Sequence, residues 1–155
     1  MKFSRIKLGR QGNFILGLLL IYFLFFGYIS SVFIKDFSGQ AHIGNRLIFL
    51  YQILFNPSTF LSFIILFGIM FFIAVRESFY EYAIRNCIWY IPAIMIISWF
   101  WYWIIYGFDP TVFYIYFIQI EGYLTILSLL CINLFAAFLA SVITEKRKEL
   151  RALEY

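Results

Sequence analysis

The segment YLTILSLLCINLFAAFLASVI, residues 123–143, contains no charged side chain in 21 consecutive positions. An α-helix rises ~1.5 Å per residue, so about 20 residues of helix cross the ~30 Å hydrocarbon core of a bilayer. Leucine, isoleucine, phenylalanine and alanine make up most of the segment, and these side chains need no polar partner in lipid. The segment therefore predicts a membrane-spanning helix.

Three earlier stretches have the same character. They cover residues 14–34, 57–75 and 87–106. Asn56 and Pro57 divide a longer apolar run, because asparagine caps helices and proline is favoured at the first helical position. The piece before them, residues 45–55, is too short to span and is expected to lie in the interface. The sequence thus predicts an all-α integral membrane protein. It forms one domain over residues 1–155, with four transmembrane helices and short apolar interfacial segments on the outer side.

The composition excludes the other broad classes of protein. Hydrophobic residues make up 64% and charged residues 13%, against roughly 45–50% and ~25% in soluble domains. Disordered chains are poor in apolar residues, and two cysteines, Cys87 and Cys131, cannot build a disulfide scaffold. Aromatic residues make up 24% and occur in all four spans. AT-rich coding and lipid-facing positions account for them, and the alternative is a groove for a lipid, an isoprenoid or a flat cofactor.

The basic residues predict the orientation of the spans, because cytoplasmic loops are enriched in lysine and arginine. Four spans would place ten of the 12 basic residues on one side: Lys2, Arg5, Lys7, Arg10, Arg76, Arg85, Lys146, Arg147, Lys148 and Arg151. Only Lys35 and Arg46 lie on the other side. We therefore expect both termini, including the tail 144–155, to be cytoplasmic, in a multi-pass protein of a prokaryotic plasma membrane. The net charge of +4 then reflects topology, and no nucleic-acid partner is expected.

Local signals predict several helix boundaries. Asn13 is expected to cap the first span, Gly107 to end the third, and Asp109 with Pro110 to open the next helix. A helix from Pro110 to residue 143 would be longer than the bilayer core. Its first part, residues 111–122, is therefore expected either to project from the membrane or to lie along the surface after a bend at Gly122.

The outer side carries the first group of candidate site residues. Glu121 is an interfacial glutamate or an ion- or proton-binding carboxylate, since acids within spans are often functional. Thr125 and Ser128 would share its helical face and extend a polar stripe inward. Asp109 and His42 are further candidates on this side. A single histidine among scattered carboxylates does not indicate a metal site, so neither a metal nor a cofactor is expected.

Small residues and one amide predict where helices pack together. Asn133, Ala137 and Ala140 share a face of the fourth span, where a buried amide bonds across a helix contact for ~0.6–2 kcal/mol. Gly27 and Ser31 form a similar small pair in the first span. These faces predict helix contacts, either within the chain or with a partner.

The cytoplasmic loop between the second and third spans contains Glu77, Glu81 and Arg85. At this spacing the three side chains would share one helical face, with Glu81 and Arg85 in the favourable i,i+4 order. The loop is expected to be a solvated helical hairpin. The alternative is a docking surface for a soluble partner.

Three functions are compatible with these features. The first is a non-catalytic polytopic subunit of a larger membrane assembly, which the four spans and the charged tail favour. The second is a small oligomeric transporter or channel that uses Glu121 with Thr125 and Ser128. The third is a lipid-modifying enzyme with an outer-face site of Glu121, Asp109 and His42 as acid–base groups. We favour the first, with the lipid bilayer and a membrane-protein partner or a homo-oligomer as its partners.

Overall fold

The computed structural model of the chain describes residues 8–29, 49–55, 60–77 and 80–153. These residues form helices joined by short turns, and none of them lies in a β-strand. In chain order the helices are α1 (Leu8–Leu20), its π-helical continuation η1 (Ile21–Gly27), α3 (Phe49–Phe55), α4 (Phe60–Arg76), α5 (Tyr80–Tyr106), α6 (Val112–Ile118) and α7 (Ile120–Leu153). The predicted all-α class is confirmed for this part of the chain. The predicted cap at Asn56, and the candidates Ser31 and His42, lie outside it.

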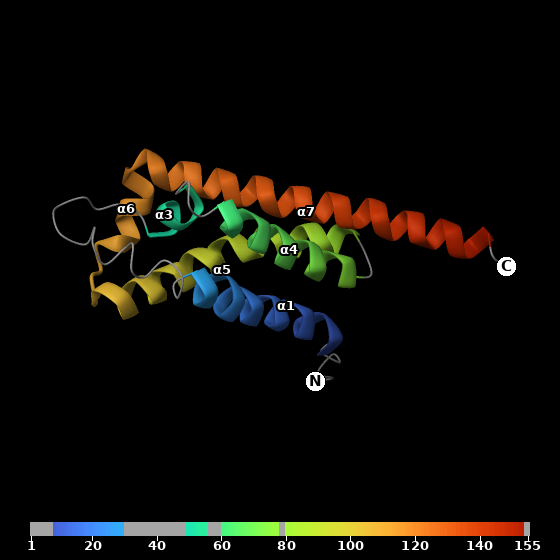
Figure 1. Ribbon diagram of the computed structural model, residues 1–155, viewed down its shortest axis with the longest axis horizontal. Helices are drawn as coiled ribbons and strands as arrows, with labels where there is room; N and C mark the ends of the chain where they lie inside the picture. Colours follow the sequence, from blue (N-terminus) through green and yellow to red (C-terminus); the bar gives the residue numbers. More distant parts are fainter. Residues whose placement is uncertain (1–7, 30–48, 56–59, 78–79, 154–155) are drawn as a thin grey trace, which may run out of the picture.

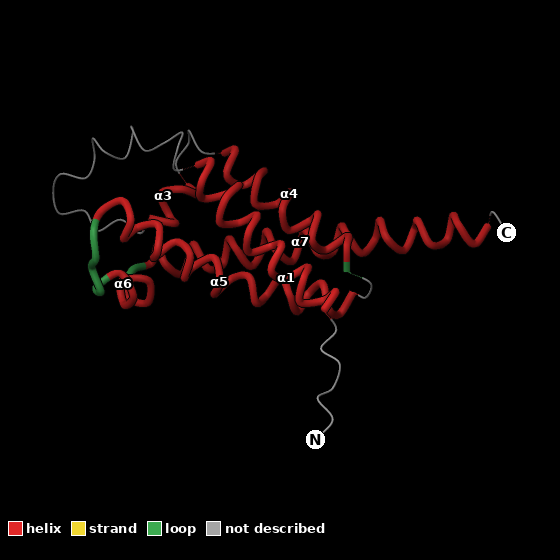
Figure 2. Tube along the Cα trace, turned by 90° about the horizontal axis from the view of Figure 1, so that it is seen from below, coloured by secondary structure: helices red, strands yellow, loops and turns green. Residues whose placement is uncertain are grey.

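The long helices form an antiparallel bundle. Figure 1 shows α1, α4, α5 and α7 lying along one long axis, each running opposite to the previous one in the chain. The short helices α3 and α6 lie at one end of the bundle in both views (Figures 1 and 2). The start of α1 and the junction of α4 with α5 lie toward the other end, and the last turns of α7 extend past it. Helix α7 packs mainly against α4 and α5.

Two helices are long and apolar enough to cross a membrane. They cover Glu81–Tyr106 in α5 and Ile120–Arg147 in α7. Two shorter apolar helices, Gly12–Gly27 and Leu61–Arg76, run beside them. Each of these four helices overlaps one of the stretches that hydrophobicity identified in the sequence.

Two predicted helix starts are wrong. Helix α1 begins at Leu8, so Asn13 lies inside the helix and is not its N-cap. Helix α5 begins at Tyr80, well before the predicted start at Cys87. In both cases polar residues extend the helix beyond its apolar stretch, and hydrophobicity alone does not register them. Gly107, by contrast, follows the end of α5 with φ +93°, which confirms its predicted role as a helix terminator.

The predicted continuous helix from Pro110 to residue 143 is also wrong. Helix α6 ends at Gln119, whose ψ of 143° is extended, and α7 starts directly after it. The bend therefore comes at Gln119, three residues before the expected Gly122. Gly122 still makes the bend possible, because a Cβ atom there would overlap the backbone carbonyl of Tyr116. The Gly122 N–H donates to the Gln119 carbonyl oxygen at 3.1 Å.

The two short helices cover one end of the bundle and pack into its core. Helix α3 buries Phe49, Leu50, Ile53 and Leu54, so the predicted interfacial segment contributes to the hydrophobic core as well. In α6, Tyr116 is 1% exposed. Its hydroxyl lies 3.1 Å from the Ser98 hydroxyl of α5 and accepts a hydrogen bond from the backbone of Leu50. This hydroxyl therefore connects α3, α5 and α6.

The variant Tyr116→Phe is expected to lower the free energy of unfolding by about 1–3 kcal/mol. It keeps the ring but removes the hydroxyl, which leaves buried polar groups at Ser98 and Leu50 without their partner. Thermal unfolding in detergent, followed by tryptophan fluorescence, measures the change. Tyr123→Phe is the matched control, since the Tyr123 hydroxyl donates to the Phe117 carbonyl oxygen at an exposed position. Equal melting temperatures for both variants would contradict the role given to Tyr116.

Candidate functional site

A buried carboxylate lies where α4 meets α5. Glu77 follows the last residue of α4 and is 8% exposed. Its Oε1 atom accepts a hydrogen bond from Asn86 Nδ2 at 3.0 Å and one from Asn13 Nδ2 at 3.4 Å. We call Asn13, Glu77 and Asn86 the carboxylate–amide cluster. The three residues come from α1, the end of α4 and the second turn of α5, so the cluster joins three parts of the chain.

Local structure explains why Glu77 turns inward. Its N–H donates to the Ala74 carbonyl oxygen at 3.2 Å, which continues the last turn of α4 for one more residue. A buried carboxylate is unfavourable unless it is hydrogen-bonded or paired. The two amides satisfy Oε1, because asparagine Nδ2 is a donor and a carboxylate oxygen only accepts.

The next turn of α5 holds α1 close beside the cluster. Tyr90 is fully buried, and its ring stacks on Phe14 with 4.8 Å between centroids. Its hydroxyl donates to the Phe14 carbonyl oxygen at 3.2 Å, with the Asn13 carbonyl oxygen at 3.4 Å. A Cβ atom at Gly17 would overlap this hydroxyl. The absence of a side chain at Gly17 therefore permits the close approach of α1 and α5.

The predicted helix-contact residues of α7 lie at the contact of α7 with its neighbours. Asn133 is fully buried, and its Nδ2 donates to the Cys87 carbonyl oxygen of α5 at 2.9 Å. Its Oδ1 is buried and has no hydrogen-bond partner within the described part of the chain. Ala137 and Ala140 are also buried. In the first predicted pair, Gly27 is half-buried in η1.

The predicted outer residues make separate local contacts. Thr125 is buried, but its hydroxyl donates to the backbone carbonyl oxygen of Glu121 at 2.7 Å, within the same helix. Glu121 and Ser128 are half-buried. The Asp109 carboxylate accepts hydrogen bonds from the backbone N–H and the hydroxyl of Thr111, at 2.9 and 2.7 Å. This turn opens α6, as the Asp109-Pro110 step predicts.

The predicted docking residues do not share one helical face. Glu81 and Arg85 are exposed on the first turns of α5, and the Arg85 guanidinium lies 4.9 Å from the centre of the Tyr82 ring. Glu77 lies before α5 and points into the bundle. The sequence misassigned Glu77 because helical spacing assumes an unbroken helix through residues 77–85. The two asparagines of the cluster were missed, although amides beside the apolar stretches are a usable signal.

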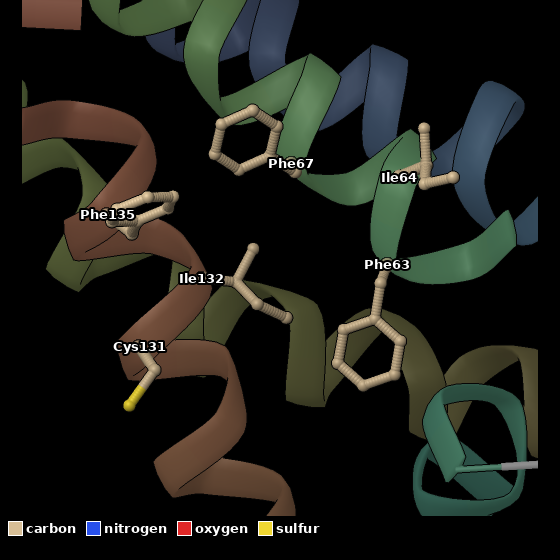
Figure 3. A pocket seen from close by; sticks show the side chains of 6 residues that line it. All are labelled: Phe63, Ile64, Phe67, Cys131, Ile132 and Phe135. Atoms are coloured by element: carbon tan, nitrogen blue, oxygen red, sulfur yellow. The ribbon is translucent and has the colours of Figure 1, made fainter. Parts of the chain in front are cut away.

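An apolar groove lies between α4 and α7, in the middle of their lengths. It has a volume of about 410 Å³ and is lined by Phe63, Ile64, Phe67, Cys131, Ile132 and Phe135. Figure 3 shows three side chains from each helix around it. The Phe67 and Phe135 rings lie 5.9 Å apart at one end of the groove. Its lining has no polar group to orient a reactant, and its chemistry is that of a surface for apolar chains.

Among the described residues, no three His, Cys, Asp or Glu side chains come close enough together to hold a metal ion. Comparison with known proteins found no family model, no curated protein and no solved structure that matches the chain.

Proposed function

We propose that this protein is a four-span membrane protein that serves as a non-catalytic subunit of a larger membrane assembly. Both termini are cytoplasmic, and the membrane is the plasma membrane of a prokaryote. The protein contributes helix packing and lipid contacts to the assembly.

Exposed apolar surface supports the membrane location. In the most apolar stretches of α5 and α7, only 22% and 28% of the residues are buried. Large side chains such as Ile104 and Phe135 are more than half exposed. Soluble monomers rarely leave apolar patches of this extent open to water. Lipid or a neighbouring membrane protein is therefore the expected surrounding.

The antiparallel order of the long helices supports the topology. Crossing the membrane four times places the start of α1, the α4–α5 junction and the end of α7 on one side, which Figure 1 shows as one end of the bundle. The basic residues gather near these three places in the sequence. The positive-inside rule assigns this end to the cytoplasm.

The projecting end of α7 is the observation on which the subunit role rests. Helix α7 continues to Leu153 and extends beyond the bundle (Figure 1). Glu145, Lys146, Arg147 and Glu149 are exposed there. Short helices are marginal in water without tertiary packing, so packing against a partner would stabilise this one. Its mixed charges suit a hydrophilic partner surface at the cytoplasmic face.

Removal of the projecting end tests the subunit role. An N-terminally tagged protein is purified in mild detergent, alongside a variant that ends at Thr144. We expect companion proteins at fixed stoichiometry with the full chain, and at least tenfold less of them with the shortened one. Both forms are expected to reach the membrane in equal amounts, because the apolar segments are unchanged.

The control variant Lys146→Gln keeps the length of α7 and is expected to retain its companions. A full chain that purifies alone, as a monomer or a homo-oligomer, and is active in that state would overturn the proposed function. Companions that stay bound to the shortened chain would overturn the role of the projecting end.

A further inference from the structure

The carboxylate–amide cluster has a charge that its own hydrogen bonds do not neutralise. Within the described residues, Glu77 is the one buried side chain that carries a formal charge. Its hydrogen-bond partners there, Asn13 and Asn86, are neutral amides. Burying an ionised carboxylate is costly unless an opposite charge compensates it. The cluster is therefore an electrostatically unbalanced site within the bundle.

We propose that the carboxylate–amide cluster of Asn13, Glu77 and Asn86 binds a monovalent alkali cation. This property is independent of the proposed subunit role. Carboxylate and amide oxygens are ligands for hard cations. The cluster supplies one carboxylate, so one monovalent cation brings its net charge to zero. Calcium sites commonly gain affinity from several carboxylates, which this cluster lacks.

The two asparagines allow the cluster to exist in two states. An asparagine amide has a donor edge and an acceptor edge, which exchange when the amide group rotates by a half turn. In the structure both Nδ2 atoms point at Glu77 Oε1. After rotation, both Oδ1 atoms would face the carboxylate and the cation between them. Hydrogen bonds hold the cluster without the cation, and three oxygen-bearing side chains hold it with the cation.

The surrounding packing keeps the ligands in place. The Tyr90 hydroxyl lies 3.4 Å from the Asn13 carbonyl oxygen and 3.2 Å from that of Phe14, so the backbone of α1 is held against α5. Asn86 lies one turn before Tyr90 on α5. Ligands from three parts of the chain then meet at one point, and the bound cation would stabilise their packing against one another.

Cation-dependent thermal stability tests this site. The purified protein is melted in detergent in sodium, potassium or N-methylglucamine chloride at equal ionic strength and constant pH. We expect sodium or potassium to raise the melting temperature relative to N-methylglucamine, by roughly 5–10 °C at about a hundredfold excess over Kd. Glu77→Gln, which keeps the shape of the side chain, is expected to abolish the rise.

The control variant Glu81→Gln removes an exposed carboxylate from the start of α5 and is expected to leave the rise unchanged. Asn86→Ala removes one ligand and should raise the cation concentration at half-effect by about tenfold or more. It provides a second reading if Glu77→Gln does not fold. Equal melting temperatures in the three salts would overturn the proposal. So would a rise that persists in both Glu77→Gln and Asn86→Ala.

Discussion

Replacement of Gly122 by alanine is expected to lower the free energy of unfolding by about 3 kcal/mol or more. An added Cβ would overlap the carbonyl oxygen, the carbonyl carbon and the Cα of Tyr116. These are backbone atoms, so no side-chain rotation relieves the overlap. The turn between α6 and α7 has to open, which displaces the buried Tyr116 side chain from Ser98. Thermal unfolding in detergent is expected to show a fall of roughly 6–12 °C in melting temperature.

Gly68→Ala is the matched control for this substitution. Gly68 lies within α4, and a Cβ atom there would meet no atom within 4 Å. Alanine costs less backbone entropy than glycine in a helix, so this variant should gain about 0.5–1 kcal/mol. A fall in melting temperature that is no larger for Gly122→Ala than for Gly68→Ala would show that the turn tolerates a side chain.

Replacement of Gly17 by alanine is the second substitution with a large expected effect, about 2–3 kcal/mol of lost stability. The added Cβ would overlap the hydroxyl and the ring carbon that bears it in Tyr90. Tyr90 is fully buried and stacked on Phe14, so its ring cannot swing into solvent. Helix α1 has to move away from α5, and the hydrogen bond to the Phe14 carbonyl oxygen lengthens. The same melting experiment measures the loss.

A second substitution identifies the cause of this loss. In a Tyr90→Leu background the ring is absent, and Gly17→Ala should cost less than half as much as in the native chain. The difference is the coupling energy between the two positions. Gly12→Ala, on the same helix with nothing within 4 Å of the added atom, is the control and should not destabilise the protein. Equal costs of Gly17→Ala in the two backgrounds would rule out the contact as the cause.

Local chemistry predicted the features that depend on neighbouring residues. Gly107 ends a helix because its positive φ suits glycine. The Asp109 carboxylate bonds to the N–H two residues later, at Thr111, a short-range turn that the Asp-Pro step announces. Each of these signals acts within a few residues, so the amino-acid order is enough to recognise it.

The same reasoning failed where a distant part of the chain decides the outcome. Asn13 has the character of an N-cap, but α1 continues through it and its side chain bonds Glu77, 64 positions away. Glu77 has the character of a solvated loop residue, but the junction of α4 and α5 turns it into the bundle. Hydrophobic pattern assigned both residues to water because it describes one segment at a time.

The amino-acid sequence by itself determined that the chain is helical and where its apolar segments lie. These properties follow from the length and composition of single segments, and a helix satisfies its own backbone hydrogen bonds. Only the tertiary structure decided which side chains meet. That depends on how each helix is rotated about its axis and how closely its neighbours approach. Gly17 and Gly122 set two of these approaches, and the carboxylate–amide cluster forms because three helices place Asn13, Glu77 and Asn86 at one point.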